Sequence, residues 1–582
     1  MNLRRNRAKP GRWTSVALSN VINYYELLKP YRRDKKKRIV LKSKLTKNMT
    51  IDKAIEKVGD EAIDAVIKEM LMIIDEKQAI ESIKIEDLSN EEKKRIIPSK
   101  MFLKEKFMAD GTFDKLKARL VAGGHMQSRD IYDDGSSPTV GTSSVFMCAC
   151  IAAHEGRSVS VIDFPGAYLN SKIPEGNIPV YMRLNKFLTM CMCAIDENHR
   201  NFVNKDGTSV VRLTRALYGT IDASKIWYDN LTGKLKEIGY IVNPHDMCVL
   251  NKIMQDGSQA TIVIHVDDLM MSCKSDNNME IALKEIESKF GEVTIQRGNV
   301  LNYLGMVFDF SIKGKVKVNM GGFIEEMLID VGNRFDGECE TPARKDLFIV
   351  GTSKEVDVKE REFFHSFTAK LLYLAKRVRP DILVAVSYLT KRVKCPNEED
   401  MVKLGRVIKY IRHTRDKGII LEGSKLLQVE AFVDASHGIH EDFRGHTGST
   451  IRIGFGPIYS KSSGQKINTK SSAESELVGL SDSTGQVVWT RNFLMSQGYE
   501  LGPATIYQDN QSTMALIKNG KSSNERTRHI AIRFFFVADR VNSNEIKLEY
   551  METESMLADI LTKPLQGELF RKLRDRLLNW YV

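Results

Sequence analysis

The chain has 582 residues, of which 42% are hydrophobic and 28% are charged, with a formal net charge of +12. This composition excludes a wholly disordered, collagen-like or coiled-coil protein, and the length leaves room for about four domains. No apolar run approaches the ~18 residues of a membrane-spanning helix, the N-terminus lacks the apolar stretch of a secretory signal, and the cysteines are too few for a disulfide scaffold.

The first 50 residues hold the whole excess of positive charge. They contain 15 basic and 2 acidic residues, whereas the remaining 532 carry a net charge of −1. The run RRDKKKR at 32–38 attracts polyanions and is typical of nuclear addresses, but a solvated linker is the plainer interpretation. The role of this basic tail or linker, residues 1–50, therefore stays open.

After the tail, the sequence predicts a helix followed by strands. Apolar residues at helical spacing predict a helix over residues 51–82, within a helical lead-in at residues 51–97. After Pro98 the pattern predicts short strands with a turn at Asp110-Gly111.

The middle of the chain alternates between buried helices and strands. Residues 143–154 suit a buried helix, SVSVID at 158–163 suits a strand, and TIVIHVDDLMMS at 261–272 suits two strands around a pair of acids. We expect helices to dominate residues 321–416.

The pattern changes again at Leu427, so we expect a domain boundary near residue 425. Three strands followed by alternating helices and strands indicate an α/β module of about 150 residues. The strands are expected at 429–436, 449–455, 456–463, 504–508 and 545–550, with a helix at 471–497.

Two pairs of cysteines suggest metal binding at first sight. Cys148 and Cys150 form one pair, and Cys191 and Cys193 form the other. Both pairs lie in apolar runs and lack the two-residue spacer of zinc knuckles, so we expect them to pack in the core.

Asp267 and Asp268 are distinguished by their surroundings. Adjacent acids arise roughly ten times by chance at this composition, but these two are flanked by apolar, β-rich runs that would form a hairpin with both acids at its tip. Asp163, at the end of a predicted strand, is the candidate for a third carboxylate. Such a set suits Mg²⁺, and two ions about 3.5–4 Å apart would clamp the oxygens of a phosphoryl transfer. An exposed acidic turn is the alternative.

A second set of acids is spread over the C-terminal module. Asp434 ends a predicted strand, Asp509 follows another, and Asp559 lies in a late helical stretch. Glu474 or Glu476 would complete four carboxylates that again hold two metal ions. Helical periodicity does not choose between the two glutamates, because both lie on the shoulders of the apolar stripe.

Motifs in a fixed order resemble the reverse transcriptase and ribonuclease H of copia-type retrotransposons. The resemblance covers roughly residues 98–582. The polymerase motifs are KARLVAGG (117–124), DFPGAYLN (163–170), VYM (180–182), LTRALYG (213–219), WY (227–228), HVDD (265–268), NYLG (302–305), YL (373–374) and RPDILVAVSYL (379–389). FVDAS, SELVGL, YQDNQS, RTRHI and LADILTKPL are similar to the ribonuclease H.

This resemblance implies a multidomain chain of α/β and α+β class. It implies a fingers–palm–thumb polymerase, a connecting helical region and a C-terminal ribonuclease H-like α/β domain. The expected parts are the fingers and palm of the reverse transcriptase at residues 98–315, the thumb and connection at 316–425, and the ribonuclease H-like domain at 426–582.

In the polymerase, the resemblance assigns Asp163, Asp267 and Asp268 as ligands of two Mg²⁺ ions, with Mn²⁺ as an alternative. It also places Tyr168, beside Ala167, as the aromatic gate that excludes a ribose 2′-hydroxyl. A packed aromatic residue is the alternative for Tyr168.

Two cations of the first polymerase motif are further candidates for substrate binding. The resemblance places Lys117 and Arg119 where such enzymes meet the incoming triphosphate. Solvated surface side chains are the alternative for both residues.

In the ribonuclease H, the family pattern selects Glu476, because SELVGL resembles the catalytic helix. Asp434, Glu476, Asp509 and Asp559 are then the expected metal ligands. His529 in RTRHI is a candidate for moving protons or releasing product, with a neutral structural histidine as the alternative.

The sequence departs from the family near the expected nucleotide and template. His265 replaces the usual tyrosine of this motif, and IDAS at 221–224 replaces the frequent Lys-Gln-Ala-Pro. These changes put the efficiency and fidelity of polymerisation in doubt, whereas the expected metal ligands remain.

The hypothesis from sequence is an RNA-directed DNA polymerase joined to a ribonuclease H, which copies retrotransposon RNA into DNA. Its partners would be an RNA template, an RNA–DNA hybrid, a primer, deoxynucleoside triphosphates and other parts of the polyprotein, without a membrane. We expect an intracellular protein, in cytoplasmic virus-like particles or in the nucleus. No capsid, protease or integrase motif is found, so we expect a polyprotein portion or a truncated gene model. The alternative is a degenerate or domesticated copy that binds nucleic acid without catalysis, or that keeps only the ribonuclease H activity.

Overall fold

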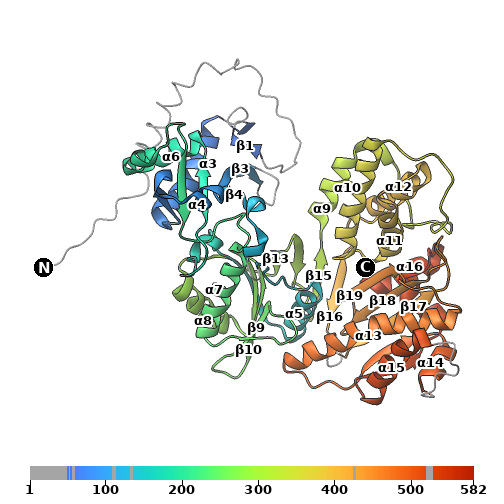
Figure 1. The fold of residues 1–582 in the computed structure, drawn as a ribbon. Helices are drawn as coiled ribbons and strands as arrows, with labels where there is room; N and C mark the ends of the chain where they lie inside the picture. The colour runs from blue at the N-terminus through green and yellow to red at the C-terminus, as the bar shows by residue number, and fades with distance from the viewer. Residues whose placement is uncertain are drawn as a thin grey trace. The chain divides into compact units, whose positions relative to one another are not determined.

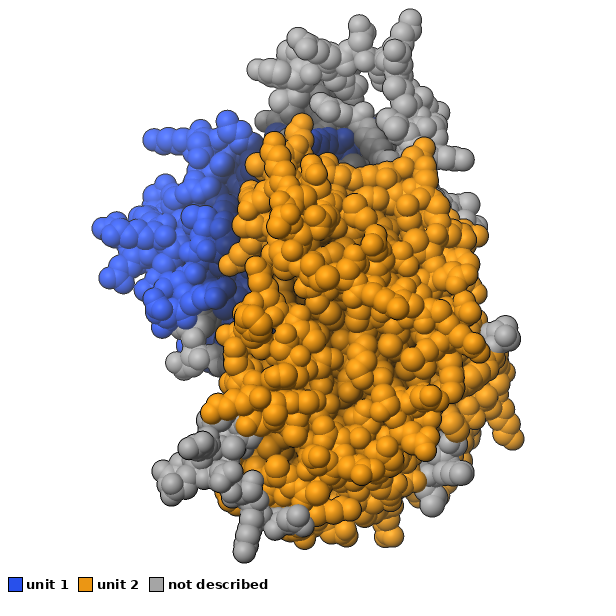
Figure 2. Space-filling view, turned by 90° about the vertical axis from the view of Figure 1, so that its right-hand side faces the viewer, with its two compact units in different colours: residues 1–138, 164–237 blue, residues 139–163, 238–582 orange. Residues whose placement is uncertain are grey.

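The computed structural model of the chain (Figure 1) divides into two compact units, which Figure 2 colours separately. Unit 1 comprises residues 1–138 and 164–237, and unit 2 comprises residues 139–163 and 238–582. Residues 1–48 of the basic tail, the predicted turn at Asp110-Gly111 and the expected boundary at 425 lie outside the described residues. The structure describes residues 49–51, 53–54, 59–107, 113–131, 135–423, 428–518 and 528–581.

Unit 1 is built on a six-stranded sheet with the order β1-β3-β6-β7-β2 and with β4 paired to β3. Helix α3 packs on β3 and β4, and its buried apolar residues join those of the sheet in one core. The elements are β1 (Met49–Thr50), α3 (Asp60–Leu71), η2 (Met72–Glu76), β2 (Ile80–Ile83), η3 (Ile85–Asp87), α4 (Asn90–Lys94), β3 (Ile97–Phe107), β4 (Phe113–Ala122), η4 (Gly124–Met126), η5 (Arg129–Ile131), η6 (Ala167–Asn170), β6 (Tyr181–Leu184), α6 (Lys186–Ile195), η7 (Glu197–Phe202), β7 (Ser209–Leu213) and α7 (Ala223–Glu237).

Two expectations for unit 1 are wrong in part. The helix expected over residues 51–82 ends at Glu76 after a π-helical turn, and β2 follows as a strand paired with β7. Pairing with β7 decides the conformation there, because local helical periodicity yields to a sheet partner. The strands expected to be short form a long hairpin, in which β3 has 11 residues and β4 has 10.

Unit 2 opens with a second six-stranded sheet, ordered β12-β5-β11-β10-β9-β8. The expected buried helix is confirmed as α5, whose residues from Ser144 to Ala153 are all buried. The strand at 158–163 and the hairpin at 261–272 are also confirmed. The elements are α5 (Thr142–Glu155), β5 (Ser158–Asp163), β8 (Ile241–Val242), β9 (Val249–Ile253), β10 (Gln259–His265), β11 (Asp268–Cys273), α8 (Asp276–Phe290) and β12 (Thr294–Gln296).

The cysteine pairs lie in the interior, as expected. Cys148 and Cys150 are buried in α5, and Cys191 is buried in α6 of unit 1, where Cys193 is half-buried. Burial raises the pKa of Cys148, Cys150 and Cys191 to about 12, so these thiols stay protonated and pack as small apolar groups.

A four-stranded sheet and the expected helices make up the middle of unit 2. The sheet has the order β13-β14-β15-β16. None of the helices that the structure describes combines the length and apolarity needed to cross a membrane. The elements are β13 (Val300–Tyr303), β14 (Met306–Asp309), β15 (Lys315–Asn319), α9 (Gly321–Val331), η8 (Gly332–Phe335), α10 (Val358–Ala375), η9 (Pro380–Ile382), α11 (Leu383–Arg392), α12 (Glu398–His413) and β16 (Ile419–Glu422).

The C-terminal part of unit 2 is a five-stranded sheet ordered β19-β18-β17-β20-β21. β17, β18 and β19 are antiparallel, whereas β17, β20 and β21 are parallel, as the predicted order of elements implies. Helix α13 packs on β17 and β18 (Figure 1). The elements are β17 (Glu430–Ser436), β18 (His446–Arg452), β19 (Tyr459–Gly464), α13 (Ser472–Ser496), β20 (Ala504–Gln508), α14 (Gln511–Lys518), α15 (Arg528–Asn542), β21 (Ile546–Tyr550), η11 (Thr553–Ser555), η12 (Leu557–Leu561) and α16 (Gly567–Leu578).

The far end of α13 contacts the sheet that contains β10. Trp489 Nε1 donates to the carbonyl of His245 at 3.1 Å, and the Ser496 hydroxyl lies 2.7 Å from Asn243 Nδ2. Beyond the helix, the Gln497 side chain accepts from that of Gln259 at 3.2 Å. One long helix therefore connects the five-stranded sheet of unit 2 with its six-stranded sheet.

Candidate active sites

The acids Asp163, Asp267 and Asp268 come from adjacent strands of one sheet. β5 pairs antiparallel with β11, and the register sets Asp163 directly opposite Asp268. Directly opposed residues project to the same face of a sheet, so these two side chains share one side. Asp267 is the second residue of the two-residue turn between β10 and β11.

This turn holds a strained backbone. Val266 has φ 58°, a region that β-branched residues rarely enter and that costs of order 1–3 kcal/mol. The flanking ladder enforces it, because Ile264 and Leu269 are paired across the hairpin and both are buried. The sheet therefore fixes Asp267 next to the opposed pair Asp163 and Asp268.

His265 stands beside these acids in place of the usual tyrosine. It is the cross-strand partner of Asp268. Burial lowers the pKa of His265, the Asp267 charge opposes this shift, and Arg377 adds to it. Its Nδ1 is buried without a hydrogen-bond partner among the described residues, and the shift favours the neutral imidazole.

The nucleotide-binding candidates lie in unit 1. The Tyr168 ring, in η6, packs against that of Tyr218 with 4.5 Å between ring centroids. The Arg119 guanidinium lies 4.6 Å from the centroid of the Tyr218 ring. Ala167 is buried, whereas Lys117 and Arg119 on β4 are exposed. Lys117 and Arg119 are two residues apart on a strand and therefore project to the same face.

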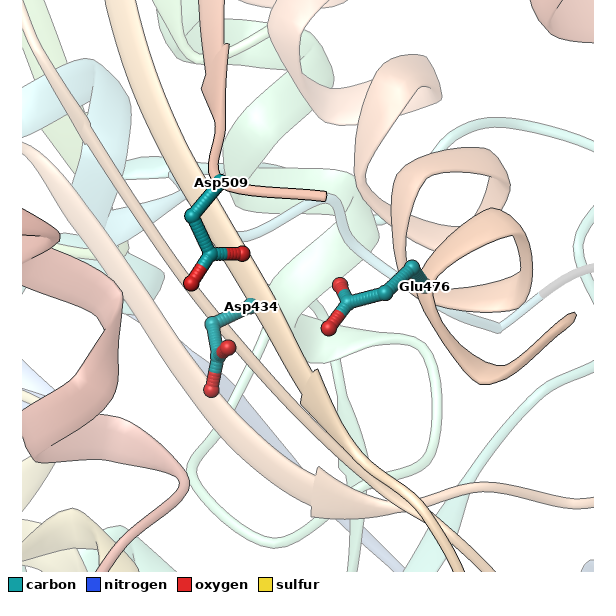
Figure 3. A group of neighbouring side chains, drawn as sticks. All are labelled: Asp434, Glu476 and Asp509. Atoms are coloured by element: carbon teal, nitrogen blue, oxygen red, sulfur yellow. The ribbon is translucent and has the colours of Figure 1, made fainter. Parts of the chain in front are cut away.

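In the C-terminal module, Asp434, Glu476 and Asp509 face one another (Figure 3). β17 and β20 are parallel, and their register, continued two residues beyond the Phe432–Tyr507 pair, sets Asp434 opposite Asp509. Glu476 reaches them from the start of α13. One oxygen of each carboxylate lies within 4.8 Å of the others, and no other group of three acidic, histidine or cysteine side chains in the described part of the chain is as close.

The electrostatics of this group favour a cation. Asp434 is 2% exposed and Glu476 is 4% exposed. Burial and then repulsion from Asp434 raise the pKa of Glu476 to about 9, and burial also raises the pKa of Asp434. A divalent cation would relieve both effects, and a set of carboxylate oxygens suits Mg²⁺. The residues present therefore fit the metal that the sequence implies.

The fourth acid is held by a lysine. Lys563 Nζ lies 2.8 Å from Asp559 Oδ1 and 3.4 Å from Asp434 Oδ1, and the Thr562 hydroxyl donates to Asp434. Burial and Asp434 together raise the pKa of Asp559 to about 6. Gly448, the cross-strand partner of Asp434, permits this approach, because a Cβ there would lie 2.7 Å from Thr562 Cγ2.

The structure separates the two glutamates that periodicity leaves equal. Glu474 accepts a hydrogen bond from the backbone N–H of Lys470 at 2.7 Å, at the N-terminus of the helix. Glu476 accepts from Gln508 Nε2 at 2.9 Å and belongs to the acidic group. The side chain of His529 lies outside the described side chains, although α15 includes its backbone.

Lys563, Gln508 and Tyr218 lie in the motifs quoted from the sequence, but the sequence assigns none of them a role. Lys563 follows Asp559 by four residues, a spacing typical of ion pairs, which was a usable signal. Gln508 directly precedes Asp509, but its partner on α13 is set by packing. Tyr218 lies in the motif LTRALYG, but its contacts are not predictable locally because its neighbours come from two other segments of the chain.

Comparisons with known proteins show what the chain is similar to. Residues 84–345 match the family described as reverse transcriptase (RNA-dependent DNA polymerase). The chain is 25% identical over 489 residues to the retrovirus-related Pol polyprotein from transposon RE1 of Arabidopsis thaliana, covering 83% of this chain and 32% of that protein. It is 25% identical over 509 residues to the transposon Ty1-LR2 Gag-Pol polyprotein of Saccharomyces cerevisiae, covering 84% of this chain and 27% of that protein.

The chain thus spans about a third or less of the length of these curated relatives. A crystal structure of prototype foamy virus protease–reverse transcriptase aligns with 95% of this chain and 64% of that chain, at 13% identity and a TM-score of 0.26, which is too low to support a conclusion. The family match includes Asp163, Asp267 and Asp268 together with the strands that hold them. Residues 84–345 therefore match a reverse transcriptase domain, and over most of its length the chain is similar to the Pol proteins of copia-type retrotransposons.

Proposed function

We propose that the chain is an RNA-directed DNA polymerase with an attached ribonuclease H, acting in the copying of retrotransposon RNA into DNA. The observation that supports the polymerase is the register that opposes Asp163 and Asp268 within the matched region. The observation that supports the ribonuclease is the group of Asp434, Glu476 and Asp509.

In the polymerase, the 3′-hydroxyl of a primer would attack the α-phosphate of a deoxynucleoside triphosphate, and pyrophosphate would leave. Asp163, Asp267 and Asp268 would hold two Mg²⁺ ions, which when bound supply positive charge at the attacking and leaving oxygens. The contribution of the protein is preorganisation. Buried neighbours and the enforced turn at Val266 fix the acids before substrate arrives, so little reorganisation is needed.

Tyr168 would select the sugar of the incoming nucleotide. A bulky ring at this position leaves no room for a 2′-hydroxyl, which excludes ribonucleotides by steric clash. Arg119 and Lys117 would bind the triphosphate, and both side chains are exposed to receive it.

In the ribonuclease, water would attack a phosphate of the RNA strand in an RNA–DNA hybrid, the bond from phosphorus to the ribose 3′-oxygen would break, and a 5′-phosphate and a 3′-hydroxyl would result. Asp434, Glu476, Asp509 and Asp559 are the proposed ligands of two metal ions. Gln508 orients Glu476 by donating to its Oε2. The hybrid would be recognised by its A-like shape and its phosphates rather than by its base sequence.

A paired assay tests this proposal. We expect purified chain to extend a DNA primer on an RNA template with Mg²⁺ or Mn²⁺, and to cut the RNA of a labelled hybrid. Cleavage without extension would leave only the ribonuclease, an outcome that the departures at His265 and 221–224 favour. If the folded chain binds hybrid but neither extends primers nor cuts RNA, it is a non-catalytic copy.

A further inference from the structure

Three side chains from separate segments of unit 1 pack against one another. Arg119 comes from β4, Tyr168 from η6, and Tyr218 from the loop that follows β7. Tyr218 is the middle member, because its ring contacts both the Tyr168 ring at 4.5 Å and the Arg119 guanidinium at 4.6 Å. We call these residues the Arg119–Tyr218–Tyr168 cluster.

The backbone at Tyr218 is clamped against the end of β4. The Tyr218 carbonyl accepts from the N–H of Ala122 at 2.8 Å. Gly219 has φ 96°, and a Cβ on it would lie 2.2 Å from the Ala122 carbonyl oxygen. A Cβ on Gly124 would in turn lie 1.9 Å from the Gly219 carbonyl oxygen. The two segments approach so closely that the Tyr218 ring projects from a fixed backbone.

The other two members are supported less directly. Tyr168 is half-buried and packs against an apolar cluster that includes Ala216, Ala223 and Ile226. Arg119 is exposed, and while burial raises the pKa of the Glu69 carboxyl, the positive charge of Arg119 acts to lower it. The Tyr218 ring therefore contacts both Tyr168 and Arg119 and links them. The cation–π contact does not neutralise the charge of Arg119, so its guanidinium can still bind an anion.

We infer that Tyr218 is a positioning residue for the selection of deoxynucleotides: it sets the orientation of the Tyr168 ring and links that ring to the cation expected at the triphosphate. This inference rests on the proposed polymerase function. A nucleotide that draws Arg119 toward its phosphates would act on the same ring that supports the gate. Phosphate binding and inspection of the sugar are then coupled through one side chain.

The test compares two substitutions at Tyr218 in the full chain. Tyr218→Phe keeps the ring and should retain the wild-type ratio of kcat/KM for a deoxynucleotide over the matching ribonucleotide. Tyr218→Leu removes the ring and should lower this ratio by about tenfold or more. KM should change more than kcat. Tyr181→Leu is the matched control, because Tyr181 is an aromatic residue of the same unit that packs in a different cluster and donates to Glu92.

A double variant decides whether Tyr218 acts through the gate. In a Tyr168→Val background, Tyr218→Leu should cause no further loss of selectivity, because the ring that it orients is gone. Additive effects, or an unchanged ratio in Tyr218→Leu alone, would overturn the inference. Melting curves of each variant show that the fold persists.

Equilibrium binding separates this inference from the proposed function. With a dideoxy-terminated primer on RNA template, wild-type chain should bind the deoxynucleotide more tightly than the ribonucleotide, and Tyr218→Leu should narrow the gap. If wild-type chain neither extends primers nor discriminates between nucleotides, the proposed polymerase is wrong. If wild-type chain discriminates and Tyr218→Leu discriminates equally, only the role of Tyr218 is wrong.

Discussion

Lys563 places a positive charge between two carboxylates of the C-terminal centre. Its ammonium contacts both Asp559 and Asp434, and the latter is almost fully buried. The negative charges of these two acids repel each other. Because little water reaches the site, each carboxylate is stabilised by a nearby positive charge. Lysine and a bound divalent cation would therefore stabilise the same group of acids by the same physical effect.

We expect Lys563→Met to lower the free energy of unfolding by about 1–2 kcal/mol in EDTA, a figure reduced for the partial exposure of the lysine. Added Mg²⁺ should restore more stability to this variant than to the wild type. Urea unfolding with and without Mg²⁺ measures both effects. Lys417→Met is the control, because Lys417 pairs with Asp575 at 4.0 Å instead of with the acidic group. Equal recovery in wild type and Lys563→Met would refute this account.

Tyr168→Val should admit ribonucleotides into the growing strand. Removing the ring leaves space for a 2′-hydroxyl, so the kcat/KM ratio between deoxy- and ribonucleotides should fall by orders of magnitude. Primer extension with each nucleotide measures this ratio. A ratio that hardly changes would mean that Tyr168 is a packing residue on Tyr218 and the Ala216 cluster.

The candidate acids could be identified from sequence because each follows a strand or opens a helix with a strong local pattern. Asp163 and Asp268 end or begin apolar strands, and neighbouring strands bring such ends together. Tyr218 could not be identified in this way, since its partners lie on elements that only packing brings near, and the spacing of Lys563 indicates its pair with Asp559 but not its contact with Asp434. Local pattern therefore indicates most of the candidate acids, but it leaves Glu474 and Glu476 undecided and does not indicate the groups that orient the acids.

At the scale of elements, the C-terminal sheet illustrates where sequence patterns fail. The second strand was expected at 449–455 but β18 starts earlier, at His446. His446 and Thr447 look like loop residues in sequence, yet both are buried. His446 Nδ1 lies 3.0 Å from His440 Nε2, and His446 Nε2 lies 2.8 Å from the Ser462 hydroxyl. These hydrogen bonds compensate the burial of the His446 ring.

This buried pair makes stability depend on pH. Burial lowers the pKa of His446 from 6.5 to about 3 and that of His440 to about 4, and nearby Lys391 adds to both shifts. The unfolded chain then takes up protons that the folded chain does not, so stability is present above pH 6.5 and is lost as pH falls.

We expect the free energy of unfolding to fall by about 1.4 kcal/mol for each pH unit below 6.5 through His446 alone, until its folded pKa is approached. His446→Gln should flatten this part of the pH dependence, measured as urea midpoints between pH 7 and 4. His365→Gln is the control, because His365 is exposed on α10. Parallel pH profiles for wild type and His446→Gln would contradict the prediction.

At the scale of the whole molecule, the two groups of acids stand on different sheets. Asp267→Asn should abolish DNA synthesis and leave RNA cleavage nearly unchanged, whereas Glu476→Gln should do the reverse. Primer extension and hybrid cleavage on the same preparations test this separation. Loss of both activities in either variant, with circular dichroism unchanged, would show that the two centres do not work independently.

Deleting the basic tail should weaken binding to RNA–DNA hybrid. A deletion of residues 1–48 removes the excess charge but spares β1, which pairs with β3. Each lost phosphate contact should reduce the slope of log affinity against log salt by about 0.9. Cleavage at saturating hybrid should persist, because no proposed metal ligand precedes Asp163. Binding curves that superimpose across the salt range would identify an inert linker or a nuclear address.

Helix α13 also sets a distance between two parts of unit 2. Its 25 residues span about 37 Å, with Glu476 near one end and the contacts to His245 and Asn243 near the other. A hybrid that reached both groups of acids would meet a polymerising centre and a cleaving centre held at a fixed separation. Each cut in the RNA would then trail the growing DNA end by a constant number of nucleotides, whatever the sequence being copied.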